Sequence, residues 1–218
     1  MSKSECSMDL TKSKLAIILS KLANNEKQNI GLEQYELPSE RAADLLWGVY
    51  MNNELKGKCV ADLGSGTGML GLGALLLGAS KVYFVDISES SMEICKKNHE
   101  KIKKEYGTVL KFGKSEFICK NVESFDQKAD VVLQNPPFGT KEKHADKIFL
   151  EKAFSCANAV YSIHKSSTRN FLEKFSAANK FKITDEKKFL FPLKQTRTYH
   201  VKKNYNVEVT WLRFEKIA

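Results

Sequence analysis

The stretch that most constrains the fold is residues 58–77, where an apolar run passes into a glycine-rich turn. Lys58–Leu63 has the length and composition of a buried β-strand. Its end overlaps the sequence Asp62-Leu63-Gly64-Ser65-Gly66-Thr67-Gly68, and an apolar helix is expected from there to about Leu77. Because glycine adopts the backbone conformations of tight turns, this stretch predicts a strand–turn–helix unit.

Strand-like and helix-like segments continue to alternate after this unit. Further strands are expected at residues 81–86, 116–119, 130–134 and 159–163, and helices at residues 88–104, 148–156 and 166–178. Ser166 or Ser167 is expected to cap the last helix. Two longer strands, at residues 180–191 and 207–214, follow it. The pattern predicts an α/β fold: a doubly wound, Rossmann-like, mostly parallel seven-stranded sheet with an antiparallel edge hairpin and helices on both faces.

Composition excludes several other classes of protein. Hydrophobic residues make up 42% and charged residues 28%, which is typical of a soluble globular chain. The longest apolar stretch, Met69–Leu77, is too short to cross a bilayer. The polar N-terminus lacks a signal-peptide core, so we expect a cytoplasmic protein, or a nuclear one in a eukaryote. The five cysteines are far apart and form no C-x-x-C pair, which argues against a disulfide framework and a metal site.

The glycine-rich turn lies where α/β proteins of this kind bind nucleotide-like ligands. Glycines let a ligand approach the main chain closely, and the next helix offers unpaired N–H groups at its start. Asp86 ends the second predicted strand, where a carboxylate can accept both hydroxyls of an adenosine ribose. Two glycine patterns overlap in the turn. Residues 66–71 fit the G-x-G-x-x-G of dinucleotide-binding proteins, and residues 62–68 fit a pattern of S-adenosylmethionine enzymes, in which Asp62 faces the amino-acid part of the cofactor.

A second motif favours S-adenosylmethionine. Asn135-Pro136-Pro137-Phe138 directly follows the fourth predicted strand, at the carboxyl edge where ligands bind. Two prolines fix this turn. The amide oxygen of Asn135 and the carbonyl of Pro136 can then accept both hydrogens of one amino group, while Phe138 offers a flat apolar face. These four residues are the candidate catalytic residues.

The chemistry expected of this turn is methyl transfer to a planar NH2 group. Two acceptors direct the nitrogen lone pair toward the methyl sulfonium, so transfer depends on positioning more than on a strong base. The turn resembles the N-P-P-[FYW] signature of amino-methyltransferases that act on adenine, guanine or glutamine side-chain nitrogens. Methylation of cytosine C5 would need a cysteine nucleophile, and none lies between Cys119 and Cys156.

Three stretches together resemble the methyltransferase-like protein 5 family of archaea and eukaryotes. They are Leu32–Tyr35, Asn135–Lys141 and Ala159–Arg169, and the resemblance covers roughly residue 10 to the end. It implies a class I, S-adenosylmethionine-dependent enzyme that forms N6-methyladenosine in small-subunit ribosomal RNA. It also implies that residues 1–53 are an N-terminal helical extension completing the cofactor pocket, and that residues 54–218 are the methyltransferase domain.

The resemblance assigns cofactor contacts residue by residue. The family's contacts fall on Gln34, Leu37, Gly64, Thr67, Met69, Asp86, Asn121 and Val122, which join Asp62, Gly66 and Gly68 of the glycine pattern. At two of these positions the sequence departs from the family. The family usually has threonine at the position of Leu37 and aspartate at that of Asn121. Because asparagine keeps a side-chain acceptor, recognition of adenine can persist.

The distribution of charge predicts a polyanionic partner. The net charge is +9, and residues 141–218 hold 17 Lys and Arg against 8 Asp and Glu, while residues 1–140 are balanced. Ribosomal RNA fits this excess. The expected RNA-binding set is Lys165, Arg169, Arg197, His200, Lys202 and Lys203. We interpret His164 as a structural or RNA-backbone residue rather than a general base.

The resemblance also implies a protein partner. The family's eukaryotic enzyme forms a heterodimer with a small zinc-binding methyltransferase activator, which adds a strand to the sheet edge and leaves little sequence pattern. Three other functions stay open: a protein glutamine-N5 methyltransferase, a ribosomal RNA guanine-N2 methyltransferase, and a non-catalytic RNA-binding module. Phe138 and the basic final third favour RNA over a protein substrate. The combination of Asp62, Asp86 and Asn135 favours an enzyme.

Overall fold

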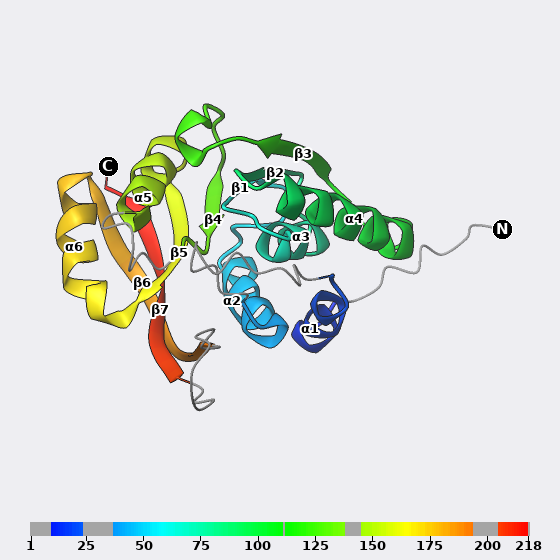
Figure 1. Cartoon of the computed structure of the whole chain (residues 1–218), viewed down its shortest axis with the longest axis horizontal. Coiled ribbons are helices and arrows are strands. Elements are labelled where there is room, and N and C mark those ends of the chain that lie inside the picture. The colour runs from blue at the N-terminus through cyan, green and yellow to red at the C-terminus, as the bar shows by residue number, and fades with distance from the viewer. Residues whose placement is uncertain (1–9, 24–36, 111, 138–144, 194–204, 218) are drawn as a thin grey trace, which may run out of the picture.

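A seven-stranded sheet with strand order β3-β2-β1-β4-β5-β7-β6 runs through the molecule (Figure 1). The structure is a computed structural model that describes residues 10–23, 37–110, 112–137, 145–193 and 205–217. Strands β1 to β5 are parallel to one another, and β7 is antiparallel to both β5 and β6. The strands are β1 (Cys59–Leu63), β2 (Lys81–Asp86), β3 (Lys114–Cys119), β4 (Val131–Gln134), β5 (Ala159–Lys165), β6 (Phe181–Leu193) and β7 (Tyr205–Lys216).

Helices cover both faces of the sheet, which confirms the predicted fold class. Figure 1 shows α1 to α4 on the right and α5 and α6 on the left. The first group shares one apolar core with one sheet face, and the second group packs on the other face. The helices are α1 (Lys12–Ser20), α2 (Ser39–Met51), α3 (Met69–Leu76), α4 (Glu89–Tyr106), α5 (Ala145–Cys156) and α6 (Arg169–Ala178). Among the described residues, no helix is long and apolar enough to cross a bilayer.

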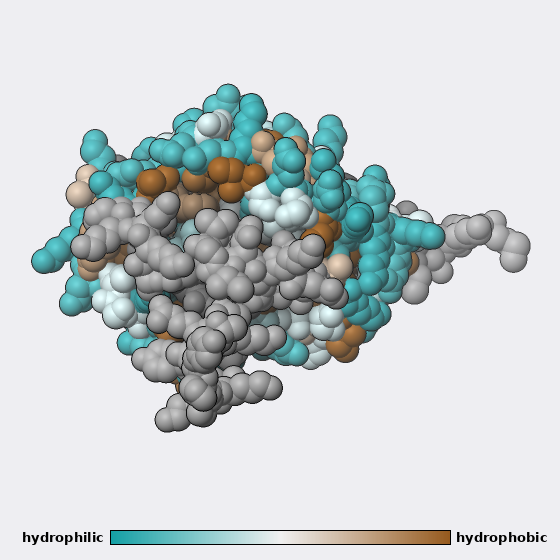
Figure 2. All heavy atoms as spheres, viewed as in Figure 1, coloured by the Kyte–Doolittle hydropathy of each residue, from teal (hydrophilic) through white to brown (hydrophobic). Residues whose placement is uncertain are grey.

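Helix α4 shows how local sequence sets one of these elements. Ser88 caps its first turn by accepting a hydrogen bond from the backbone N–H of Ser91, and Lys103 and Lys104 lie in its last turn. The cap stabilises the helix because it pairs a backbone N–H group that has no partner within the helix. The two lysines stabilise it because their positive charge lies near the partial negative charge of the helix C-terminus. The outward surface of α4 is mainly hydrophilic (Figure 2), whereas Met92 and Ile102 are buried against the sheet.

Helix α6 begins later than the sequence predicts. Residues Ser166–Thr168 form a short 3-10 turn, and α6 starts at Arg169. The hydroxyl of Ser166 is 2.7 Å from that of Thr210 on β7. The residue at the N-cap position of α6 is Thr168, not Ser166 or Ser167, and its side chain makes no cap hydrogen bond. The pairing of Ser166 with β7 therefore replaces a local cap.

The N-terminal helices are packed into the main core. Leu15 and Leu46 are fully buried in the same apolar cluster as Val60 of β1. Helix α2 crosses α3 closely: a Cβ added at Gly73 would lie 2.3 Å from the Leu46 side chain. The division at residue 53 stays a prediction.

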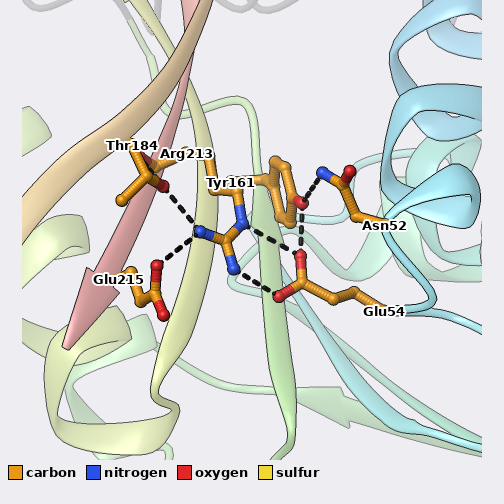
Figure 3. Close-up of polar contacts among 6 residues, drawn as sticks. All are labelled: Asn52, Glu54, Tyr161, Thr184, Arg213 and Glu215. Carbon is orange, nitrogen blue, oxygen red and sulfur yellow. Dashed lines mark hydrogen bonds and ion pairs between the residues drawn. The ribbon is translucent and has the colours of Figure 1, made fainter.

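A polar network joins the link between α2 and β1 to strands β5 and β7 (Figure 3). Arg213 of β7 donates from Nη2 to Glu54 Oε1 at 2.6 Å and from Nε to Glu54 Oε2 at 3.1 Å. The hydroxyl of Tyr161 donates to Glu54 as well and accepts from Asn52 at 2.9 Å. Arg213 and Glu54 expose only 15% and 17% of their side chains, so this is a largely buried ion pair.

Candidate active site at the carboxyl edge of the sheet

Strand register brings the two predicted motifs to one edge of the sheet. Leu63, at the end of β1, pairs with Val85 of β2 on one side and with Gln134 of β4 on the other. The glycine turn, Asp86 and Asn135 each follow directly on one of these paired positions. In parallel α/β sheets, ligands bind at this edge. The two motifs and Asp86, which are far apart in the sequence, are therefore neighbours in space.

The glycine turn leaves open space at Gly66. Gly64, Gly66 and Gly68 all have positive φ angles, of +70°, +53° and +93°, which favour glycine. A Cβ at Gly64 would lie 2.9 Å from the Phe149 ring, and one at Gly68 would lie 2.6 Å from Cys95 Sγ. At Gly66 a Cβ would meet no atom of the described residues within 4 Å. The outer two glycines are thus required by packing as well, whereas at the middle one the described residues leave open space beside the turn.

Asp86 holds this turn from the side of β2. Its Oδ2 accepts a hydrogen bond from the backbone N–H of Gly66 at 2.7 Å, and its Oδ1 accepts one from that of Ser88 at 2.8 Å. Burial raises the pKa of this carboxyl, while the N–H groups of Ser88 and Gly66 oppose the shift. The backbone N–H of Ile87 acts on the same carboxyl. A carboxylate has about four lone-pair sites, so acceptor capacity remains for a ribose hydroxyl.

Asp62 makes its hydrogen bond to the protein itself. Its Oδ2 accepts from the backbone N–H of Gly71, in the first turn of α3, at 2.7 Å. Burial raises the pKa of Asp62 to about 7, and the nearby charge of Asp86 adds to the rise. Asp62 therefore ties β1 to α3. Its contact with the amino-acid part of a cofactor stays a prediction.

The remaining predicted cofactor residues lie at different depths. Asn121 is exposed, and its Oδ1 accepts a hydrogen bond from the backbone N–H of Glu123 at 3.0 Å, so its side chain already caps a 3-10 turn. Val122 and Leu37 are buried in opposite apolar clusters, and Met69 begins α3. Gln34 lies outside the described residues.

The candidate catalytic turn directly follows β4. Asn135 and Pro137 are half-buried and Pro136 is buried, while Phe138 lies outside the described residues. The side chain beneath the turn is Gln134, which is fully buried and donates from Nε2 to Ser162 Oγ at 3.0 Å. Ser162 Oγ is in turn 2.7 Å from His164 Nε2. A buried row of polar groups therefore runs from β4 into β5 under the candidate catalytic residues.

His164 belongs to this buried row. Only 2% of the residue is exposed, and burial lowers its pKa to about 3. The ring is therefore neutral at physiological pH and packs inside the sheet. Of the two roles proposed from the sequence, this placement fits the structural one, and it separates His164 from any RNA backbone at the surface.

The predicted RNA-binding residues fall partly within the described chain. Lys165 is half-buried at the end of β5. Arg169 forms ion pairs with Glu186 at 2.7 Å and Glu173 at 3.2 Å, so a phosphate would have to compete with two carboxylates for it. The other four, Arg197, His200, Lys202 and Lys203, lie outside the described residues.

Two buried amides near the site were missed by the sequence reasoning. Gln134 looks like the last residue of a strand, and nothing in its neighbourhood marks it as buried. Asn98 lies on α4 and is 1% exposed. The available signal was position, because Met92, Cys95 and Ile102 form the apolar side of α4 and Asn98 lies among them.

Comparisons with known proteins agree with this geometry. Residues 43–190 match the family model described as "Conserved hypothetical protein 95". The chain is 34% identical over 192 residues to the rRNA N(6)-adenosine-methyltransferase METTL5 of Danio rerio, covering 87% of this chain and 91% of the relative. It is 31% identical over 200 residues to the rRNA N(6)-adenosine-methyltransferase Mettl5 of Drosophila melanogaster, covering 87% of this chain and 89% of the relative.

A solved structure gives the same relationship in three dimensions. The crystal structure of PH1948 from Pyrococcus horikoshii superposes with a TM-score of 0.85 at 38% identity, covering 97% of this chain and all of that one. Sequence identity above 30% over most of both chains, the shared fold and the two motifs at one sheet edge agree with one another. The chain belongs to the methyltransferase-like protein 5 family of S-adenosylmethionine-dependent methyltransferases.

Proposed function

We propose that this chain methylates N6 of an adenosine in ribosomal RNA, and that the adenosine belongs to the small subunit. The observation that carries the proposal is the pairing of Leu63 with Gln134, which sets the Asn135 turn beside the open space at Gly66. The residues fit S-adenosylmethionine because Asp86 retains acceptor capacity next to that space. When bound, this cofactor supplies an electrophilic methyl group.

The chain's own residues position the base in this proposal. The Asn135 side-chain oxygen and the Pro136 carbonyl accept the two hydrogens of the adenine amino group. Phe138 stacks on the ring, and the proline turn keeps both acceptors fixed. The nitrogen lone pair is then directed at the methyl group, so the protein's contribution is orientation.

The proposal is tested by incubating the chain with ribosomal RNA and labelled S-adenosylmethionine, then separating the subunit RNAs and analysing their nucleosides. We expect label in N6-methyladenosine of the small-subunit RNA. Label in N2-methylguanosine, or in glutamine of a ribosomal protein, would replace the proposal with one of the two rival enzymes. Cofactor and RNA binding without any transfer would favour a non-catalytic module.

We expect cofactor binding to depend on Asp86. Asp86→Ala removes a charged acceptor, and each such hydrogen bond is worth about 1.5–3 kcal/mol, so the Kd for S-adenosylmethionine should rise by a factor of about 10–100. Calorimetric titration measures this change. Glu89→Ala is the matched control, because Glu89 is an exposed acidic residue three positions away. A folded Asp86→Ala protein with the wild-type Kd would remove Asp86 from the site.

RNA affinity should fall steeply with salt, and the basic final third should cause this. Bound phosphates release counterions, so the slope of log K against log salt reports how many are neutralised. Changing Lys202 and Lys203 together to Glu should flatten the slope by about two units. The control changes Lys103 and Lys104, two lysines in the last turn of α4. If both double variants keep the wild-type slope, the RNA surface lies elsewhere.

A small zinc-binding activator is the proposed protein partner, bound as a heterodimer by strand addition. Among the described strands, β3 and β6 form the two edges of the sheet. β6 carries the consecutive charged residues 185–188, a feature that discourages edge pairing. We therefore place the activator at β3, where Phe117 and Ile118 are half-buried. Size-exclusion chromatography with and without such an activator tests for a one-to-one complex.

A further inference from the structure

Asn98 contacts the glycine turn one residue after the one that Asp86 contacts. Its Nδ2 donates to the Thr67 carbonyl at 3.0 Å and to the Ala23 carbonyl at 2.9 Å. Its Oδ1 accepts from the backbone N–H of Ala23 at 2.8 Å. One buried side chain on α4 thus joins the turn to the chain just after α1.

The bond to Thr67 fixes one particular peptide plane. The Thr67 carbonyl and the Gly68 N–H belong to the same planar group. The N–H donates to the Ser65 carbonyl at 2.8 Å, and the carbonyl accepts from Asn98, so both ends of the plane are held. Gly66, one residue earlier, donates its N–H to Asp86. The turn beside the open space at Gly66 is therefore fixed by hydrogen bonds at Gly66 and at Thr67 without a ligand.

Asn98 contacts both the glycine turn and the chain after α1, and other residues of α4 share only the second of these contacts. Lys101 donates from Nζ to the Lys21 carbonyl at 2.8 Å, and Glu105 forms an ion pair with Lys21 at 3.6 Å. These contacts hold the end of α1 only. Of the three α4 side chains, Asn98 alone has a described contact with the glycine turn. Several side chains of α4 thus bond to the end of α1, whereas among these three only Asn98 bonds to Thr67.

We propose that Asn98 is a positioning residue for the cofactor, acting through the Thr67–Gly68 peptide. Burying an amide costs free energy unless its groups are paired, and here the three hydrogen bonds of Asn98 join main-chain atoms of Ala23 and Thr67. By keeping the turn in its binding conformation, Asn98 removes part of the ordering cost of binding. The inference rests on the proposed function, because it takes S-adenosylmethionine as the ligand of this turn.

The test compares Asn98→Asp with Lys101→Met. Asn98→Asp keeps the size of the side chain and the acceptor for the Ala23 N–H, but loses the donor to the Thr67 and Ala23 carbonyls. We expect its Kd for S-adenosylmethionine to rise about tenfold, the equivalent of one hydrogen bond. In methylation assays the KM for the cofactor should rise while kcat at saturating cofactor stays within about twofold. Lys101→Met removes a bond to α1 alone, so its Kd should equal that of the wild type.

Two further measurements keep the inference falsifiable. Asn98→Ser, a smaller neutral change, is titrated as well in case the aspartate variant does not fold, and the same rise in Kd is expected. Arg213→Met, which destabilises the protein far from the turn, should leave the Kd unchanged, and this separates positioning from stability. A folded Asn98 variant with the wild-type Kd overturns the inference. A wild-type protein that binds no cofactor overturns the proposed function instead.

Discussion

Asn135→Ala should bind S-adenosylmethionine normally and transfer methyl groups about 10²–10³ times more slowly than the wild type, by analogy with loss of one oriented donor from an oxyanion hole. Asn135 follows β4 and is half-buried at the carboxyl edge. In the proposed mechanism its side-chain oxygen touches the base, so removing it should leave cofactor affinity intact. Single-turnover rates with ribosomal RNA, together with a calorimetric Kd, measure the two effects separately.

The expected loss is large because the interaction strengthens during the reaction. As the adenine nitrogen accepts the methyl group it becomes positively charged, and its N–H groups become better donors. Acceptors at Asn135 and Pro136 then bind the transition state more tightly than the ground state, which is the condition for raising kcat. A contact that was equally strong in both states would change KM instead.

Asn135→Asp is the informative companion to this change. It keeps an oxygen acceptor but adds a charge to a partly desolvated site, so we expect activity between those of the alanine variant and the wild type. Cofactor affinity should again be unchanged. If Asn135→Ala methylates RNA within about threefold of the wild-type rate, the turn is only a scaffold and the proposed mechanism is wrong.

The strands were predictable because a parallel sheet leaves a local signature. β1, β2 and β4 are covered on both faces, so their sequences are short, nearly continuous apolar runs with few polar breaks. The long pair β6 and β7 also stood out by its length. The start of α6 was less predictable, because Ser166 pairs with Thr210 on a strand 44 residues away.

The candidate site was predictable only in part, because only some of its residues leave a local mark in the sequence. Glycines at positive φ and a double proline mark their own positions, so Gly66 and the Asn135 turn could be found by spacing. Residues that act through distant partners carry no such mark. Asn98 reaches Ala23, 75 residues away, and Arg213 reaches Glu54, 159 residues away. The packing of α4 places Asn98 beside Ala23, and the position of β7 in the sheet places Arg213 beside Glu54.

Arg213→Met should lower the free energy of unfolding by about 3 kcal/mol, the lower end of the range for breaking a buried ion pair. The variant leaves Glu54 with its charge largely buried and without the two hydrogen bonds that Arg213 supplies. Urea denaturation monitored by circular dichroism measures the change. Arg169→Met is the matched control: its partners, Glu173 and Glu186, expose 66% and 43% of their side chains, so the expected loss is under about 1 kcal/mol.

A second substitution shows whether the stranded charge causes the loss. Glu54→Gln in the Arg213→Met background removes that charge but keeps a carbonyl oxygen for the hydroxyl of Tyr161, which donates to Glu54 in the wild type. Because most of the cost of breaking such a pair comes from the unpaired charge, the double variant should recover more than half of the lost stability. If the double variant is no more stable than Arg213→Met alone, the packing of the arginine side chain, rather than its charge, stabilises the contact between β7 and the link from α2 to β1.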